Sequence, residues 1–429
     1  MTEYWVLTVG VLVFAGHLFS AIFKKTNIPD VLPLIFIGIV IGIYIEPEHA
    51  FGEFGHVFLE IALALLLFEG GAHLTLASIK KSIGSSISIA LITFLITTLI
   101  TTIVLQAFMF SLLPSIFAGI LLGSISPAVV IPTVRILSIS EETKTSLIME
   151  SAITDVLSIV LAIIIINLDF NFDELQNMTA VMLINTVLYA ILISAAIGTF
   201  GAIIWSFILQ RIRQFPNTIF TSLAFIIILH SISNIFEYNG PLTVLVFGLV
   251  LANSQKMPMG FLRSYGKIHL TEFSSIEKSF FAEIMFLVKV FFFIYLGIAI
   301  EFSQLQFLII ALILTFLIYA SRLLITKFTL PKSTSYNEAK LISFMIPKGL
   351  AAAVLSAKAI EDMGRNELLT SMLYDIQSII YGVILFSIIF SAYLVYTENE
   401  ETNFKFFRKV LKHFPIYSND SEDVYDTKS

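Results

Sequence analysis

The chain has 429 residues, of which 57% are hydrophobic and 13% charged, and its formal net charge is −6. Soluble domains carry about 25% charged residues, so this composition excludes an ordinary soluble protein. The long apolar runs predict transmembrane helices and exclude a membrane β-barrel, whose strands span about 10 residues each. Cysteine is absent, which excludes disulfides, thiolate metal sites and cysteine nucleophiles.

Apolar runs predict about 13 membrane-spanning helices, so the expected fold class is an all-α polytopic membrane protein. Several runs begin or end at Pro, Gly or Asn, which interrupt helices. The expected spans are residues 4–22, 31–46, 55–72, 84–109, 115–137, 143–168, 178–207, 217–236, 240–253, 278–299, 305–329, 338–361 and 370–396. No charged leader or small-residue cleavage site precedes the first run, so we expect it to be retained.

Basic residues gather in the loops that follow every second span. These loops carry Lys24, Lys25, Lys80, Lys81, Arg135, Lys144, Arg211, Arg213, Lys256, Arg263, Lys267, Lys327, Lys332, Lys340, Lys405, Arg408, Lys409 and Lys412. The intervening loops are mainly acidic, with Arg365 as the main exception. Because basic loops stay in the cytoplasm, the alternation predicts a plasma-membrane protein with its N-terminus outside and its C-terminus inside.

The stretch from Glu150 to Ser158 places two carboxylates inside the sixth apolar span. A charged group at membrane depth costs about 2.5–3.5 kcal/mol on insertion scales and usually faces a cavity or a partner. On a helix, Ser151, Asp155 and Ser158 share one face, whereas Glu150 and Thr154 lie on an adjacent stripe. The two acids are therefore expected to meet different neighbours, the alternative being that both belong to a structural polar network.

The fifth span contains Pro127 and Pro132, preceded by Gly and Ser. Proline interrupts a helix. A helix broken inside a membrane leaves free backbone groups, which must line a cavity or an ion site. The pattern predicts a broken helix, and the alternative is a helix that is kinked but continuous.

The twelfth span contains a matching interruption at Pro347-Lys348-Gly349. Spans five and twelve are an odd number of spans apart, so they run in opposite directions, as inverted repeats require. Two crossing broken helices beside the acidic sixth span would form an ion site.

The expected organisation follows from this repeat. Residues 1–397 form the transmembrane domain, with inverted repeats at roughly 1–168 and 217–397 joined by the span at 178–207. Residues 398–429 form a short cytoplasmic tail.

Four further ionisable residues lie within the expected spans. Arg322 stays charged in a membrane and needs a carboxylate, for which Glu150 is the natural candidate, although it could also reach the cytoplasmic surface. Glu69 either faces a water-filled cavity or caps the end of the third span. Lys289 has no assigned partner, and His230 is interpreted as a packed polar residue in preference to a sensor.

Taken together, these segments resemble the sodium/proton antiporters of the monovalent cation:proton antiporter superfamily over nearly the whole chain. The matching segments are Phe68-Glu69-Gly70-Gly71, Ser126-Pro127-Ala128-Val129-Val130-Ile131-Pro132, Glu150-Ser151 with Asp155, Gly240-Pro241-Leu242-Thr243-Val244-Leu245 with Gly248-Leu249, Arg322, and Pro347-Lys348-Gly349. The Glu-Ser-x-x-x-Asp helix between two broken helices is a specific signal.

The resemblance implies a homodimer in which a core part moves as an elevator against a dimerisation part. It implies that Asp155 alternately binds a monovalent cation and a proton. The expected cation- and proton-binding residues are Asp155, Ser151, Thr154, Ser126, Ile125 through its carbonyl, and Glu69 through water. Glu150 and Arg322 would form the family's structural ion pair. The partners are the transported Na⁺, Li⁺ or K⁺ and H⁺ together with membrane lipid, with no cofactor and no nucleic acid.

Two places depart from the family pattern. Thr154 stands where relatives with one carboxylate have Asn and the other main branch has Asp, and Ile125-Ser126 stand where many members have Thr-Asp. The site is therefore poorer in carboxylates. We expect Asp155 alone to switch between proton and cation, which predicts electroneutral exchange unless Lys348 also carries a transported proton.

Na⁺/H⁺ antiport is the leading functional hypothesis, and K⁺/H⁺ antiport is the alternative. A cation channel is less favoured because Asp, Arg and Lys side chains at mid-membrane would line a conducting pore poorly. An enzyme is not expected, since the sequence has neither a His-Glu-x-x-His metal motif nor a nucleophile elbow.

Overall fold

The computed structural model describes most of the transmembrane domain. The described residues are 10–19, 21, 31–44, 47–73, 76–137, 139–167, 180–212, 219–236, 238–253, 274–300, 304–331, 334–362 and 367–396. The expected tail at 398–429 lies outside them.

The elements of the described chain are α-helices. Their bounds are α2 Val31–Gly42, α3 Pro47–His73, α4 Leu76–Ala107, α5 Leu112–Gly123, α6 Pro127–Ile136, α7 Glu141–Asn167, α9 Ala180–Ile212, α10 Ile219–Ile235, α11 Gly240–Ala252, α13 Ser275–Ile298, α14 Leu305–Thr329, α15 Tyr336–Phe344, α16 Leu350–Asp362 and α17 Glu367–Tyr396. The all-α fold class predicted from the apolar runs is confirmed.

Length and composition identify the helices that span the membrane. Within the described residues, seven segments are long and apolar enough to cross it: Ile87–Ala107, Leu112–Ile131, Glu141–Ile166, Ile191–Ile212, Ser279–Ile298, Leu305–Thr329 and Glu367–Tyr393. Shorter apolar helices are Gly10–Phe19, Val31–Gly42, Phe220–Ile235 and Gly240–Ala252. The protein is therefore a multi-pass membrane protein, while the number of 13 spans stays a prediction.

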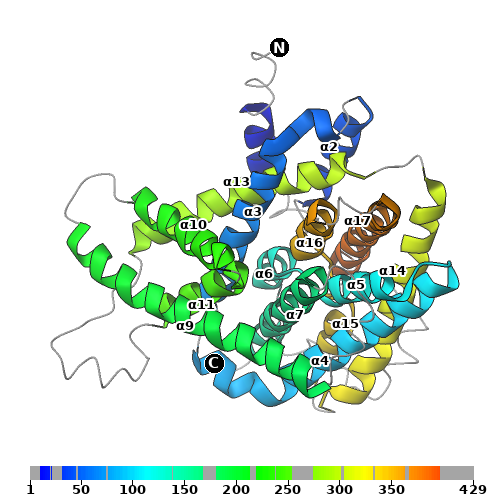
Figure 1. Ribbon diagram of the computed structural model, residues 1–429. Coiled ribbons are helices and arrows are strands. Elements are labelled where there is room, and N and C mark those ends of the chain that lie inside the picture. Colours follow the sequence, from blue (N-terminus) through cyan, green and yellow to red (C-terminus); the bar gives the residue numbers. More distant parts are fainter. Residues whose placement is uncertain are drawn as a thin grey trace, which may run out of the picture.

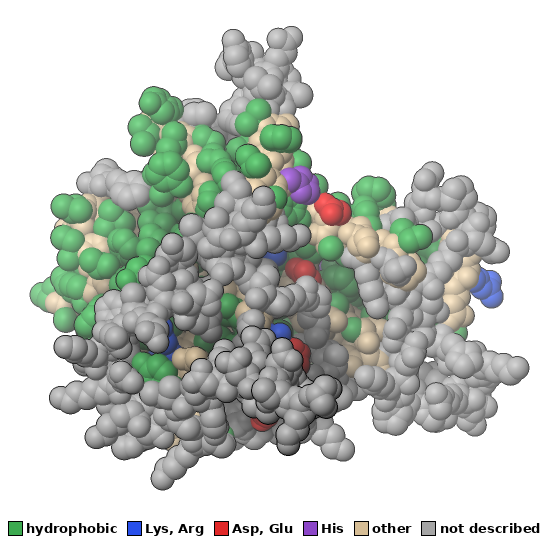
Figure 2. Space-filling view, turned by 180° about the vertical axis from the view of Figure 1, so that it is seen from behind, with side chains coloured by type: hydrophobic (Ala, Val, Ile, Leu, Met, Phe, Trp, Pro, Cys, Tyr) green, Lys and Arg blue, Asp and Glu red, His purple; other side chains and the backbone are tan. Residues whose placement is uncertain are grey.

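The outer surface of the described helices suits a lipid environment. Large hydrophobic side chains such as Phe14, Phe200, Phe316 and Phe328 are exposed. Figure 2 shows hydrophobic side chains over much of the described surface on one face, with few charged side chains between them. Lipid tails can cover such side chains at no cost, whereas water cannot.

The helices pack into two groups (Figure 1). One group, which we call the α11 bundle, contains α2, α3, α9, α10, α11 and α13. The other, which we call the α7 bundle, contains α4 to α7 and α14 to α17. Most helix packing lies within a group. The two groups meet where α3 packs on α16, where α7 packs on α9 and α11, and where α17 packs on α2.

Glycines allow close helix crossing inside the α11 bundle. A Cβ atom at Gly71 of α3 would collide with the Leu245 carbonyl of α11, and one at Gly248 would collide with the Phe68 carbonyl. Small residues let membrane helices approach to backbone contact, where van der Waals packing holds them together. The glycines of these two matching segments therefore fix α3 against α11.

Both expected interruptions are present in the α7 bundle. Residues 124–126 separate α5 from α6 and are called the first break. Residues 345–349 separate α15 from α16 and are called the second break. Pro127 occupies the start of α6, a position where its missing N–H costs nothing. The expectation that Pro132 also breaks the helix is corrected, because α6 continues through it to Ile136. A proline inside a helix removes one backbone hydrogen bond. The other backbone hydrogen bonds of α6 keep the segment around Pro132 helical.

Candidate functional site

The two broken helices cross at their interruptions. The Ser126 N–H donates a hydrogen bond of 2.8 Å to the Pro347 carbonyl, which joins the first break to the second. Gly349 is required by the close approach, because a Cβ there would collide with the Ser126 side chain. A backbone N–H of the first break is thus hydrogen-bonded to a backbone carbonyl of the second, which avoids unpaired polar groups inside the membrane.

Lys348 forms a second link between the breaks. Its side chain is fully buried, and its ammonium donates to the Ser124 carbonyl at 3.0 Å. The electrostatic neighbours of this ammonium are Arg322, Glu150 and Asp155. The Lys348 amine is therefore held at the crossing point, within electrostatic reach of the Asp155 carboxylate.

Asp155 projects from α7 toward the crossing. It is only 6% exposed, and within the described chain its Oδ1 has no hydrogen-bond partner. The Ser124 hydroxyl is its hydrogen-bonding neighbour, and the Lys348 ammonium acts on it electrostatically. A buried charge without full compensation is costly. This carboxyl group is therefore suited to holding either a proton or a cation.

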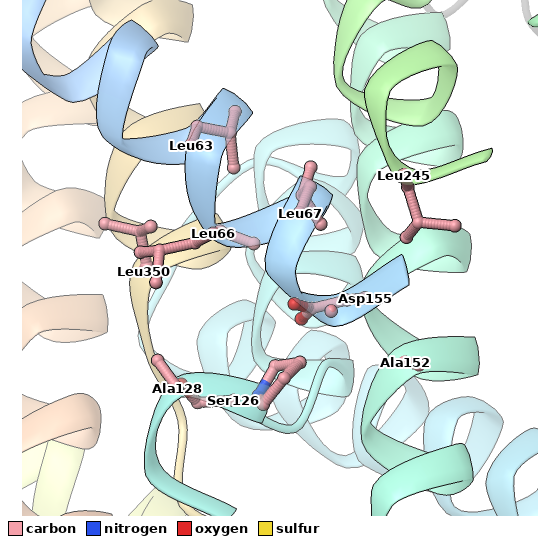
Figure 3. Close-up of a pocket in the computed structure, with 12 residues that line it drawn as sticks. Leu63, Leu66, Leu67, Ser126, Ala128, Ala152, Asp155, Leu245 and Leu350 are labelled. Atoms are coloured by element: carbon pink, nitrogen blue, oxygen red, sulfur yellow. The ribbon is translucent and has the colours of Figure 1, made fainter. Parts of the chain in front are cut away.

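A narrow pocket opens beside Asp155, with about 20 Å³ of free space. That is room for about one water molecule. Its lining residues are Leu63, Leu66, Leu67 and Gly70 of α3, Leu245 of α11, Ala152 and Asp155 of α7, Ser126, Pro127 and Ala128 at the first break, and Leu350 and Ala351 of α16. Figure 3 shows the Asp155 carboxylate between Leu67 of α3 and Ser126 of the break. The pocket therefore lies on the boundary between the α11 and α7 bundles.

The hydroxyl groups near Asp155 have different roles. The Thr154 hydroxyl donates to its own helix, at the Glu150 carbonyl (2.9 Å), and accepts from the Ile125 N–H at 3.1 Å. The Ser151 hydroxyl donates to the Ile148 carbonyl at 2.9 Å and keeps its lone pairs. Thr154 thus holds the first break in place, whereas the Ser151 hydroxyl oxygen can still accept a hydrogen bond or bind a cation.

Glu150 faces a different neighbour from Asp155. Its two carboxylate oxygens accept from Arg322 Nη1 at 2.6 Å and Nη2 at 2.7 Å. Arg322 also donates from Nη1 to the Thr93 hydroxyl and from Nε to the Ile342 carbonyl at 3.2 Å. Both members of the pair are almost completely buried. This bidentate pair joins α7 and α14 to α4 and α15.

Of the predicted cation- and proton-binding residues, Asp155 and Ser126 line the pocket, whereas Ile125, Ser151, Thr154 and Glu69 do not. Glu69 is half-buried on α3, next to Gly70, which does line the pocket. Lys289 is half-buried on α13. His230 is buried on α10, with its Nε2 3.6 Å from Glu60 Oε2 on α3.

Glu60 also connects the two bundles. Its Oε1 lies 3.6 Å from the Lys358 ammonium on α16, and both side chains are partly exposed. Sequence analysis missed this contact because Glu60 and Lys358 are far apart in the sequence. The only available signal was the presence of both charges inside apolar spans.

Within the described residues, no group of three or more His, Asp or Glu side chains is arranged to hold a metal ion. Asp155 is the single carboxylate in a pocket that is lined mainly by apolar side chains, with Ser126 as its other polar lining residue.

Comparisons with known proteins bear on the family and the fold. A family model described as "Sodium/hydrogen exchanger, transmembrane" matches residues 10–396. The fold is similar to a structure of the sodium proton antiporter MjNhaP1 from Methanocaldococcus jannaschii at pH 8, with 22% identity and a TM-score of 0.71 over 96% of this chain and 99% of that one. An electron-microscopy structure of the same antiporter shows 21% identity and a TM-score of 0.70 over 93% and 97%. At these identities the structures establish the shared fold.

Proposed function

This chain belongs to the sodium/hydrogen exchanger family, and we propose that it exchanges Na⁺ for H⁺ across the plasma membrane as a secondary active antiporter. One observation carries the proposal. Asp155 presents a buried carboxyl oxygen without a partner in the described structure, in a pocket that lies between two helix bundles. A carboxylate in such a place takes up one cation or one proton at a time.

The neighbouring groups would complete the cation shell. We assign the Ser126 hydroxyl, the Ile125 carbonyl and the Ser151 hydroxyl as ligands beside Asp155, with Glu69 acting through water. Thr154 is assigned a positioning role, since its hydroxyl is bonded to the Ile125 N–H.

Exchange is proposed to be electroneutral, one cation for one proton. Arg322 cannot lose its proton, and Glu150 holds it in a bidentate pair. Asp155 bound to Na⁺ and Asp155 bound to H⁺ carry the same charge, so no net charge moves. Lys348 stays a fixed positive charge in this scheme.

One assay in proteoliposomes tests the exchange and its stoichiometry. A Na⁺ gradient is expected to drive proton flux at a rate that does not change when K⁺ and valinomycin clamp the membrane potential. Adding Na⁺, Li⁺ and K⁺ in turn decides between Na⁺/H⁺ and K⁺/H⁺ antiport. A rate that follows the imposed potential contradicts electroneutral exchange, and resolved unitary currents would indicate a channel.

Alternating access is proposed to arise from the α7 bundle sliding as an elevator against the α11 bundle within a homodimer. The position of the pocket on their boundary supports this proposal, because a slide would carry Asp155 past α3 and α11. The same slide must separate Glu60 from Lys358, which lie on opposite sides of the boundary.

Cross-linking tests the slide. In this cysteine-free chain, Glu60→Cys combined with Lys358→Cys is expected to lose nearly all exchange when a short bifunctional thiol reagent joins the two positions. The matched control is Glu141→Cys with Lys144→Cys, which replaces an ion pair of 2.9 Å inside α7 alone. Cross-linking that control should leave the rate unchanged. Full exchange by the cross-linked boundary pair would refute the slide.

The basic loops support an outside N-terminus and a cytoplasmic C-terminus. Cysteines placed at Glu48 and Lys81 should then react with a membrane-impermeant reagent from opposite sides, at Glu48 from outside. Labelling of both positions from one side would overturn this orientation.

A further inference from the structure

The second break is held by hydroxyl groups of α17. The Lys348 N–H donates to the Ser387 hydroxyl oxygen at 2.9 Å, and the Ser391 hydroxyl donates to the Phe344 carbonyl at 3.1 Å. Phe344 ends α15, so its carbonyl has no partner within that helix. Both serines are buried. They bond two backbone groups of the break, as backbone groups inside a membrane require.

Tyr319 of α14 completes this arrangement. Its hydroxyl lies 2.8 Å from the Ser391 hydroxyl and donates to the Ser387 carbonyl at 2.8 Å. The same tyrosine stacks on Phe344. The position of the break is therefore set by α14 and α17 together.

The first break is held in the same way. The Ile125 N–H donates to the Thr154 hydroxyl on α7, and that hydroxyl donates to a carbonyl of its own helix four residues back. The Ser387 hydroxyl likewise donates to a carbonyl of its own helix, at Ile384, while accepting from Lys348. α7 and α17 contain the sixth and thirteenth expected spans, which are equivalent in the proposed inverted repeat. Ser387 is thus the counterpart of Thr154.

We infer that Ser387 is a positioning residue for transport, acting through Lys348. The hydrogen bond fixes the Lys348 peptide, and the side chain of the same residue reaches the Ser124 carbonyl at 3.0 Å. These two contacts fix the distance between the Lys348 ammonium and the Asp155 carboxylate. The inference rests on the proposed antiport function, because its consequence is a change in cation binding at Asp155.

Loss of the Ser387 hydroxyl leaves the buried Lys348 N–H without a partner and releases the ammonium from its fixed place. The ammonium then competes with Na⁺ for the Asp155 carboxylate. Ser387→Ala is expected to raise the apparent KM for Na⁺ about 2- to 10-fold, the range that one hydrogen bond accounts for. The maximal rate is expected to fall less, since the ions that bind are still carried.

Four further variants of the full chain in proteoliposomes test this. Ser387→Thr keeps the hydroxyl and should restore the wild-type KM. Ser378→Ala is the matched control, because Ser378 lies on the same helix and its hydroxyl bonds only to Tyr374 within that helix among the described contacts. It should behave as wild type. Lys348→Gln combined with Ser387→Ala should show the same Na⁺ dependence as Lys348→Gln alone, because coupled residues are non-additive.

Thermal unfolding at increasing Na⁺ concentration measures binding even in variants that do not transport. A wild-type KM for Ser387→Ala, or equal KM changes in the alanine and threonine variants, overturns the inference. A fall in maximal rate with an unchanged KM also overturns it, since that result indicates a structural role only. Failure of the wild-type protein to exchange ions refutes the proposed function instead.

Discussion

Replacing Asp155 by asparagine is expected to reduce cation/proton exchange to the background of empty liposomes. Asparagine keeps the size and hydrogen-bonding capacity of the side chain, but it can neither bind a proton at working pH nor compensate the charge of a cation. Asp155 is the only carboxylate among the residues lining the described pocket, so no other lining group can substitute for it. The loss should therefore appear in the maximal rate and should not be recovered at high Na⁺.

The measurement is Na⁺-driven proton flux in proteoliposomes, with thermal unfolding in detergent as the check on folding. The matched control is Asp375→Asn on α17, where the carboxylate lines a separate groove together with Gln306 and Phe307. That variant should transport as wild type. The Asp155→Asn protein should also lose the stabilisation that Na⁺ gives the wild type. Exchange at the wild-type rate by Asp155→Asn would remove Asp155 from the mechanism.

The fold was predictable because membranes limit the choice of structure. Apolar runs of about 20 residues must form helices, since a helix satisfies its own backbone. Proline and glycine mark the places where that rule is locally broken. Sequence could not show which proline starts the second half of a broken helix. Pro127 does so after the turn at 124–126, whereas Pro132 lies inside α6.

The separate surroundings of the two acids on α7 were also predictable. Glu150 and Asp155 are five residues apart, so at about 100° per residue they point in different directions. In the structure Glu150 contacts Arg322 and Asp155 borders the pocket. Their roles in transport remain predictions that the variants above decide.

The contacts that hold the site could not be read from the sequence. Serine and threonine are common in membrane helices, and nothing marks Thr154 or Ser387 as the partner of a particular N–H group. The pocket wall presents the same difficulty. Leu63 and Leu67 resemble lipid-facing leucines in sequence, and only the packing of α3 on the α7 bundle places them at the site. Such contacts join segments far apart in the chain.

The largest expected effect on stability comes from separating Glu150 and Arg322. Glu150 is 1% exposed and Arg322 is 0% exposed. Removing one partner of a buried pair leaves a charge without compensation and costs roughly 3–5 kcal/mol. Arg322→Ala also removes the bonds to the Thr93 hydroxyl and the Ile342 carbonyl. Both single alanine variants should therefore unfold well below the wild-type temperature in detergent.

The double variant shows whether Glu150 and Arg322 stabilise the fold through their mutual contact or independently. Replacing both residues leaves no stranded charge, so Glu150→Ala with Arg322→Ala should be less destabilised than the sum of the two single variants. Thr93→Val is the matched control, because it removes one neutral acceptor and should cost about 1 kcal/mol. Arg322→Lys should fall between wild type and alanine, since an ammonium cannot form the two parallel bonds that Glu150 accepts. Strict additivity of the two alanine variants would mean that the pair does not act as one unit.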